Sequence, residues 1–198
     1  MNKLLAALFV CYSSYAQADT FSQFFNSFET LSADFTQQTI SESGSLLNHN
    51  SGYLLFKRPQ QFIWQIETPN QQTLLLNDNQ LWLIDSELEQ ASQRDINSIK
   101  NTPLYWLLNR DKHLRKRPEY SHTQADIDWY ITQQKSKLSF GFIDEKLHAI
   151  SLINPLNQTI VVRFSAVVLN TDIAENAFKL NLPKDFDVIH IQKINNTI

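Results

Sequence analysis

Phenylalanine residues near the start of the chain recur with helical spacing. Phe21, Phe24, Phe25 and Phe28 lie at positions i, i+3, i+4 and i+7, so they share one face of a helix. Polar residues fill the positions between them. We therefore expect an amphipathic helix that begins at residues 19–20, where Asp and Thr can both cap it.

The hydrophobic period changes to two from residue 31 onward. Leu31, Ala33 and Phe35 alternate with polar residues, which predicts a strand with one buried face. Short turns rich in Pro, Asn and Asp separate the runs that follow, and short turns favour antiparallel hairpins. The strand-like runs cover roughly 51–57, 61–67, 72–77, 80–85, 87–92, 127–133, 136–143, 147–153 and 158–168.

Two further segments complete the pattern. Residues 102–110 predict a second helix, with Thr102 as N-cap, Pro103 in the first turn, and an apolar stripe formed by Leu104, Leu107 and Leu108. The last part, Ala177 to Ile189, predicts a short strand, a break at Pro183 and another strand. The result is an α+β fold, mainly antiparallel β, whose sheet buries one face by closing or half-closing into a barrel. The helices then fit over the mouth or interior of that barrel.

The first 18 residues have the form of a secretion signal. Lys3 precedes a short apolar run, Leu4 to Val10, and Ala16-Gln17-Ala18 is an A-x-A cleavage site. We expect residues 1–18 to be removed and residues 19–198 to form one domain in the periplasm. Cys11 is the sole cysteine and lies in the leader without a small residue before it, so we expect a soluble chain without a lipid anchor, thiol or disulfide.

Composition and motifs give little support for catalysis. The net charge of −3 gives no reason to expect a nucleic-acid surface, and the short basic segment 112–117 is better explained as a surface loop. The five histidines are scattered and do not have the spacing of metal ligands. The chain has three glycines, too few for a Gly-rich cofactor loop. Asp126 and Asp128 could act as an acid–base pair, but a solvated strand face explains them much better. We expect no enzyme, no cofactor, no metal and no catalytic residue.

One arginine lies among apolar residues. Leu54, Phe56 and Arg58 share one face of a predicted strand, and on the next strand Phe62, Trp64 and Ile66 share one face. If these faces line a barrel, Arg58 lies at the edge of an apolar cavity, where a cation needs partners such as helix C-terminal carbonyls. Arg58 could then latch a helical lid, or it could form an ordinary surface pair at a strand end.

The aromatic residues allow two interpretations as well. Phe24, Phe28, Phe35, Phe62, Trp64 and Trp82 could line a lipid cavity or fill an ordinary core, because periodicity cannot distinguish a hollow barrel from a filled one.

A longer motif resembles a known family. The run from Gly52 to Trp64, GYLLFKRPQQFIW, resembles the LolA pattern G-x-L-x-x-x-R-P-x-x-F-x-W, and Phe35-Thr36-Gln37 is similar to that family's early F-x-Q strand. Leu88 to Ala91, Asn101 to Pro103 and Phe178 to Leu180 continue the resemblance, which spans nearly all of residues 19–198. It is strong for 52–91 and weak for 111–160. The sequence departs from the pattern at Asp78-Asn79, where a D-G turn is common, and after Arg110.

The resemblance implies an unclosed β-barrel covered by an α-helical lid. It also implies a monomeric periplasmic carrier that takes the acyl chains of lipoproteins from an inner-membrane ABC transporter and gives them to an outer-membrane receptor. Arg58 matches the family's lid-latch arginine and Phe62 a mouth position important for transfer. The cavity and mouth residues expected on this basis are Phe24, Phe28, Phe35, Leu54, Phe56, Phe62, Trp64, Ile66 and Trp82.

Four alternatives remain at the level of sequence. The chain could bind another amphiphile, such as a glycolipid or another acylated product, on the same fold. It could be the receptor, although Cys11 is poorly placed for acylation. It could be a periplasmic enzyme, which requires a polar cluster inside the cavity. It could also be an interaction protein with a filled barrel.

Overall fold

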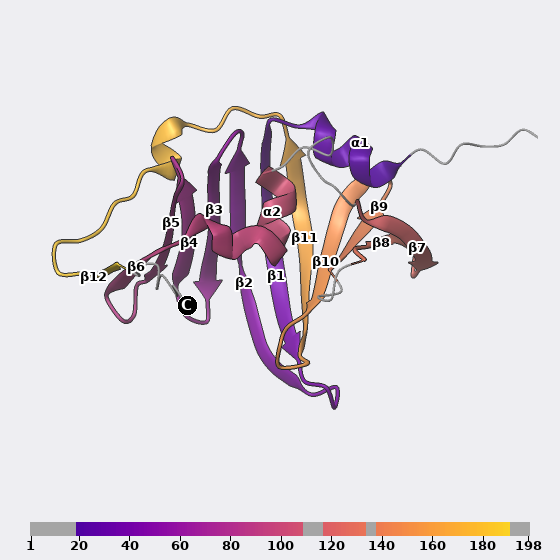
Figure 1. Cartoon of the computed structure of the whole chain (residues 1–198), viewed down its shortest axis with the longest axis horizontal. Helices are drawn as coiled ribbons and strands as arrows, with labels where there is room; N and C mark the ends of the chain where they lie inside the picture. The colour runs from indigo at the N-terminus through magenta and orange to yellow at the C-terminus, as the bar shows by residue number, and fades with distance from the viewer. Residues whose placement is uncertain (1–18, 109–116, 134–137, 191–198) are drawn as a thin grey trace, which may run out of the picture.

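A single twelve-stranded sheet forms the framework of the protein (Figure 1). The computed structural model describes residues 19–108, 117–133 and 138–190. The sheet is antiparallel, except that β12 pairs with β6 in parallel, and its order is β12-β6-β5-β4-β3-β2-β1-β11-β10-β9-β8-β7. The strands are β1 (Thr30–Ile40), β2 (Leu46–Lys57), β3 (Gln61–Thr68), β4 (Gln72–Asn77), β5 (Gln80–Asp85), β6 (Gln90–Arg94), β7 (Glu119–Gln124), β8 (Ile127–Ile131), β9 (Ser139–Ile143), β10 (Lys146–Ile153), β11 (Thr159–Leu169) and β12 (Asp187–His190).

The sheet is curved but not closed. Its edge strands, β12 and β7, stand at opposite ends of the strand order and do not pair with each other. The mainly antiparallel, unclosed sheet with short helices confirms the predicted fold class. Helix α2 (Pro103–Leu108) crosses in front of the sheet, whereas α1 (Thr20–Ser27) lies at its upper end (Figure 1).

Helix α1 forms as its phenylalanine spacing predicts. Asp19 is its N-cap, and its carboxylate accepts the backbone N–H of Ser22 at 3.3 Å. Phe21 and Phe25 are completely buried, with ring centroids 4.4 Å apart. Phe28, just after the helix, is buried as well. The apolar face of α1 therefore packs into the core on the concave side of the sheet.

The alternation on β1 and β2 selects which side chains face this core. Leu31, Ala33 and Phe35 are buried, while the residues between them are half-buried or exposed. On β2 the buried positions include Leu54 and Phe56. The register pairs Ala33 with Leu54, so both strands present the same face. These residues belong to the main core cluster, which also includes the aromatic residues of α1 and β9.

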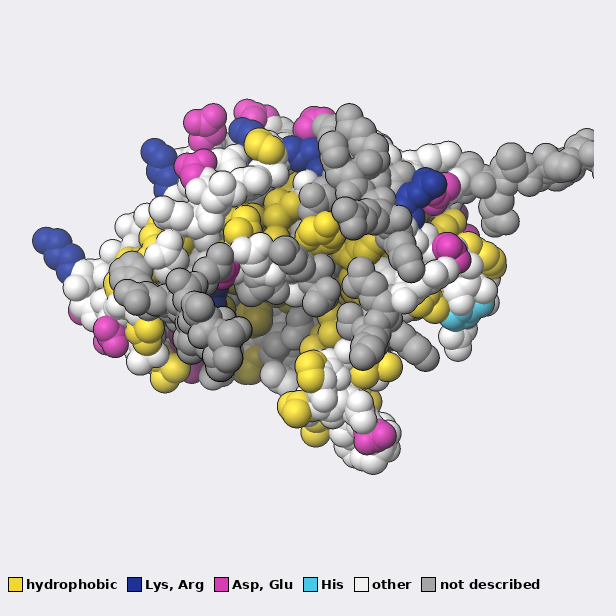
Figure 2. Space-filling view, viewed as in Figure 1, with side chains coloured by type: hydrophobic (Ala, Val, Ile, Leu, Met, Phe, Trp, Pro, Cys, Tyr) yellow, Lys and Arg dark blue, Asp and Glu magenta, His cyan; other side chains and the backbone are white. Residues whose placement is uncertain are grey.

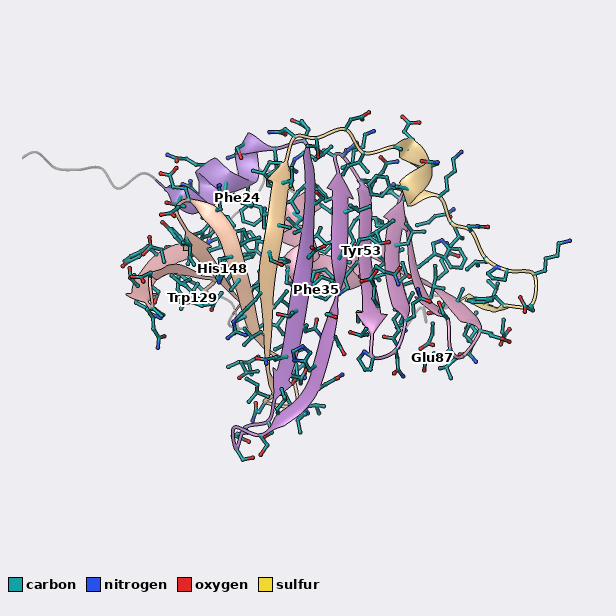
Figure 3. All side chains as sticks on the ribbon, turned by 180° about the vertical axis from the view of Figure 1, so that it is seen from behind. Phe24, Phe35, Tyr53, Glu87, Trp129 and His148 are labelled. Atoms are coloured by element: carbon teal, nitrogen blue, oxygen red, sulfur yellow. The ribbon has the colours of Figure 1, made fainter. Side chains whose placement is uncertain are left out.

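A second, smaller cluster covers the outer face of the sheet. Ile63, Leu75, Trp82 and Ala91 point outward from β3 to β6, under Ile173 and Phe178 of the segment that follows β11. That segment passes along the back of the molecule toward β12 (Figure 3). Trp82 was expected in the cavity, and this is wrong: it pairs with Leu75 on the outward face of β5. Its neighbours Leu81 and Leu83 face inward instead.

Three details differ from the predicted elements. A 3₁₀ helix, Ile96–Asn101, precedes α2. A second one, Glu175–Phe178, replaces the first of the two strands expected after Ala177. The exposed edge strand β7 was not predicted, because all six of its side chains are exposed and leave no hydrophobic alternation. The leader, residues 109–110 of the predicted second helix and residues 112–116 of the basic segment lie outside the described residues.

Candidate functional site

An apolar cavity lies between the concave face of the sheet and the segment that contains α2. Its volume is about 440 Å³, within the ~300–1,000 Å³ common for small-molecule sites. Hydrophobic side chains are visible in the middle of this face (Figure 2). The wall comes from β1 to β6, from β10 and β11, and from the 96–107 segment. It consists of Leu31, Ala33, Gln37, Leu54, Phe62, Trp64, Leu74, Leu81, Leu83, Arg94, Ile99, Thr102, Pro103, Leu104, Leu107, Leu147, Ile150, Leu152, Ile160, Val162, Phe164 and Val167.

The predicted cavity residues divide into three groups. The first group lines the wall: Leu54, Phe62, Trp64 and, from α2, Leu104 and Leu107. The second group packs in the core around the cavity and is not part of its wall: Phe24, Phe28, Phe35, Phe56, Ile66 and Leu108. Phe35 supports the wall directly, since its ring stacks on Trp64 with centroids 3.8 Å apart. Trp82 forms the third group, on the opposite face.

Arg58 joins the two helices to the sheet. It follows β2, and its backbone N–H donates to Glu29 O at 2.9 Å, which fixes the strand end beside the end of α1. Its Nη1 donates to Leu107 O at 2.9 Å and, more weakly, to Leu108 O at 3.4 Å. Its Nη2 donates to Phe25 O at 2.7 Å, and its Nε donates to Phe28 O at 3.0 Å. One guanidinium therefore binds backbone carbonyls at the C-terminal ends of both α1 and α2.

These contacts explain how a cation can lie among phenylalanines. The last carbonyls of a helix have no partner within the helix and carry the negative end of its dipole, so a guanidinium with five donors satisfies them. The guanidinium carbon also lies 5.1 Å from the ring centroid of Phe28 and 5.3 Å from that of Phe56, a distance suited to cation–π attraction. The six described residues of α2 are too few to form a stable helix on their own. Arg58 and the packing of Leu104 and Leu107 therefore hold it over the cavity.

Several wall residues were not predicted from the sequence. They lie on two strands on the side of β1 away from β2: β11 pairs with β1, and β10 pairs with β11. These residues are Leu147, Ile150, Leu152, Val162 and Phe164. Alternation within each strand shows that one face is apolar, but it does not show which strands share a cavity. Among the described wall residues, Arg94 at the end of β6 is the one that carries a charge. It is exposed, and its Nε donates to Ser92 Oγ at 3.3 Å.

Other candidate chemistry does not gather at the cavity. Asp126 and Asp128 lie in the exposed β7–β8 hairpin, where Asp128 accepts a hydrogen bond from Thr123. Arg117, at the end of the basic segment, forms an exposed ion pair with Asp19 at 3.1 Å. Among the described residues there is no group of three or more His, Cys, Asp or Glu that could hold a metal ion. None of the helices in those residues is long and apolar enough to cross a membrane.

Comparison with known proteins assigns the fold and cavity to a family. The family model described as outer membrane lipoprotein carrier protein LolA matches residues 26–181. The chain belongs to this family. The LolA match includes β1 to β11, the cavity wall and Arg58, and it identifies a family of carriers rather than enzymes.

Individual LolA relatives extend over most of the chain. The outer-membrane lipoprotein carrier protein of Hahella chejuensis is 30% identical over 187 residues, with 88% of each chain covered. That of Azotobacter vinelandii is 30% identical over 188 residues, covering 88% of this chain and 90% of its own. An uncharacterized conserved protein from Thermus thermophilus has a similar structure, with a TM-score of 0.54 at 9% identity, covering 86% of this chain and 95% of that chain. At that identity the structural likeness shows the fold alone.

Proposed function

We propose that the protein is a periplasmic carrier of lipoproteins, and that the cavity under α2 holds their acyl chains. The carrier receives a lipoprotein released from the inner membrane by an ABC transporter and delivers it to a receptor at the outer membrane. The observation that carries this proposal is the cavity itself, whose wall is almost entirely aliphatic and aromatic. The LolA family and the relatives from Hahella chejuensis and Azotobacter vinelandii are described as outer-membrane lipoprotein carriers, which supports the same cargo.

The physical need for such a cavity is large. Burying a CH₂ group is worth ~0.8 kcal/mol. Exposing an acyl chain of roughly 16 carbons to water therefore costs about 12 kcal/mol of free energy. The predicted leader at residues 1–18 supports export to the compartment that a lipoprotein must cross. A carrier also has to release its cargo. The closed, empty state must therefore be stable enough for the loaded protein to return to it when the cargo leaves.

Arg58 supplies that stability in the proposal. Its hydrogen bonds to Phe25 O and Leu107 O hold the helices together over the empty cavity. Acyl chains that enter beneath α2 separate the helix ends and break these bonds. The loaded state is then less stable than apolar burial alone would make it, and re-forming the bonds drives release. Phe62 lines the cavity near Arg58, because it lies on β3 and pairs with Phe56 near the end of β2. It is the proposed mouth residue for transfer.

The proposal is tested by loading the protein with its cargo. Residues 19–198 are incubated with membranes that contain the transporter and a triacylated lipoprotein, with and without ATP, and the soluble fraction is examined by native mass spectrometry and lipid extraction. We expect one lipoprotein per carrier, only with ATP. A different lipid bound after purification from the periplasm would indicate another amphiphile as cargo, and a protein that stays empty throughout would contradict carriage.

A matched pair of variants shows whether the cavity does the binding. Leu74→Glu places a carboxylate in the half-buried part of the wall, whereas Leu88→Glu makes the same change at an exposed leucine in the β5–β6 turn. We expect Leu74→Glu to lower loading by at least about tenfold and Leu88→Glu to leave it unchanged. Equal loading by both variants would move the cargo site away from this cavity.

A further inference from the structure

Two hairpin tips at the lower end of the sheet expose large aliphatic side chains. Leu46 is 57% exposed and Leu47 is 52% exposed on β2, just after the β1–β2 turn. Leu156 is 75% exposed in the β10–β11 turn, and Ile153 is 41% exposed at the end of β10. We call these four residues the tip patch. Figure 2 shows hydrophobic side chains on the part of the molecule that projects below the sheet.

Strand register places the two tips side by side. Ile40, at the end of β1, pairs with Leu46 on one side and with Thr159 on the other. Thr159 in turn pairs with Ile153. Leu46 and Ile153 are therefore separated by three strand spacings, or about 14 Å at ~4.8 Å each. The β1–β2 hairpin extends beyond the neighbouring strands in Figures 1 and 3, so the patch forms the lower end of the molecule.

The exposure of these leucines is not a result of loose turns. In the β10–β11 turn the side chain of Asn154 accepts the backbone N–H groups of Leu156 and Gln158, at 2.9 and 3.0 Å. In the β1–β2 turn the hydroxyl of Ser41 accepts the backbone N–H of Ser45 at 3.0 Å. Polar side chains thus order both turns, and the side chains of the leucines take no part in these hydrogen bonds. Exposed apolar side chains held in ordered structure indicate a contact surface.

The surroundings of the tip patch carry almost no charge. Glu42 is the one acidic residue between positions 37 and 51, there is no Lys or Arg there, and residues 151–160 contain no charged residue. Leu47 is the extra residue of a β-bulge, because Asn48 pairs with Thr39 and Leu46 pairs with Ile40. The two adjacent exposed leucines therefore form one uncharged apolar edge at the projecting end of the sheet. Such an edge can enter the apolar part of a lipid layer without burying a charge.

The patch lies on the face of the sheet opposite the cavity. Leu152 and Ile160 line the cavity wall and pair with each other, so the next pair, Ile153 and Thr159, points to the other face. Thr159 also pairs with Ile40, which pairs with Leu46, so Leu46 shares that outer face. The tip patch is therefore a surface separate from the cavity.

We propose that the tip patch inserts shallowly into the headgroup region of a lipid bilayer and holds the projecting end of the sheet at the membrane surface. The partner is an uncharged lipid surface, because the tip has no basic residues to select anionic headgroups. Contact by a few leucines is weak and reversible, as a carrier that must leave the membrane requires. The purpose of the contact rests on the proposed carrier function, but the contact itself needs no cargo.

Vesicle binding by the empty protein tests this contact. Residues 19–198 are mixed with vesicles of phosphatidylethanolamine and phosphatidylcholine, and the bound fraction is measured by flotation at low and high salt. We expect weak binding that salt does not reduce, and a loss of at least about tenfold in the partition coefficient for Leu47→Ser with Leu156→Ser, because two leucines no longer enter the lipid. Leu88→Ser, an equally exposed leucine outside the patch, is the matched control and should bind as the parent chain does. No binding by the parent chain, or equal binding by all variants, would overturn the proposal.

Fluorescent labels identify what touches the tip. Residues 19–198 contain no cysteine, so Leu47→Cys, Leu156→Cys and Leu88→Cys each carry a single environment-sensitive dye. We expect blue-shifted emission with vesicles for the labels at 47 and 156 and none at 88. A response at 47 and 156 to detergent-solubilised transporter or receptor, with none to vesicles, would show a protein-docking surface and refute the lipid contact. The double variant Leu47→Ser, Leu156→Ser should still load normally from a detergent-solubilised lipoprotein. This loading test therefore examines the proposed carrier function separately from the proposed lipid contact.

Discussion

Arg58 is the residue at which stability and proposed function meet. Its guanidinium contributes to the fold only while the ends of α1 and α2 stay together, because its acceptors Phe25 O, Phe28 O and Leu107 O belong to both ends. A leucine at this position would keep the apolar contacts with the neighbouring rings but leave the carbonyls without donors. The closed state would become less stable, whereas the stability of an open state with separated helices would change little.

We predict that Arg58→Leu lowers the free energy of unfolding of the empty protein by about 2–3 kcal/mol, since hydrogen bonds to a charged group are worth ~1.5–3 kcal/mol each and the site is partly solvated. Urea denaturation measures this change. Cargo should be held more tightly and transferred to the receptor more slowly, because the competing closed state is weaker. Arg163→Leu is the control, as Arg163 is exposed on β11 and donates to Gln38 alone at 3.2 Å among its described partners. Unchanged release from Arg58→Leu would refute the latch.

Gly52 shows how one residue sets the pairing of two elements, β2 and β3. A Cβ atom at Gly52 would lie 1.8 Å from Gln65 O and 2.8 Å from its carbonyl carbon, and both are backbone atoms of the paired strand. Neither strand can move without losing the contacts that place Phe56 opposite Phe62. The glycine that opens the sequence motif is thus explained by a close approach of two backbones.

We predict that Gly52→Ala lowers the free energy of unfolding by more than about 4 kcal/mol or prevents folding. Gly44→Ala separates the steric cost from the conformational one, because Gly44 has φ +87° and no heavy atom within 4 Å of its added Cβ. It should cost about 1 kcal/mol. Similar melting temperatures for the two variants would contradict the steric explanation.

At the scale of elements, the sequence predicted well which face of the sheet a side chain points to, wherever hydrophobic and polar residues alternate. On β1 and β2 the alternation correctly placed Ala33 and Leu54 on the concave face. On β5 the run Leu81 to Ile84 is continuously apolar, so periodicity offers no choice of face, and Trp82 was wrongly assigned to the cavity. The continuous run arises because both faces of β5 are covered there, one by the main core and the other by the segment after β11.

The outer cover has its own testable role. We predict that Phe178→Leu, at a completely buried outer position, lowers the free energy of unfolding by about 1–2 kcal/mol and leaves the affinity for a fluorescent acyl probe unchanged. Phe164→Leu, in the cavity wall, should have a similar effect on stability but should alter probe affinity. If Phe178→Leu weakened probe binding as strongly as Phe164→Leu, the two faces of the sheet would be coupled rather than independent.

At the scale of the whole molecule, the sequence could predict an apolar concave face but not its hollow interior. A filled core and a lined cavity use the same residue types, and here both occur side by side: Phe35 is packed into the core, while Trp64, which stacks on it, borders empty space. Seven of the 22 wall residues come from β10 and β11, whose place on the far side of β1 is set by long-range pairing that no local pattern encodes.

An unfilled apolar cavity lowers stability, because its wall lacks the contacts that a filled core would make. A chain selected for stability alone would fill it, so the cavity implies a benefit when it is occupied. Ala33 is the smallest side chain in the wall and points into the cavity from the middle of β1. We predict that Ala33→Leu raises the free energy of unfolding of the empty protein by about 0.5–1 kcal/mol and lowers acyl-probe affinity several-fold. Ser32→Leu adds a larger apolar side chain on the opposite face of the same strand and should leave probe affinity unchanged. A stabilised Ala33→Leu protein that still binds acyl chains normally would mean that cargo does not occupy this space.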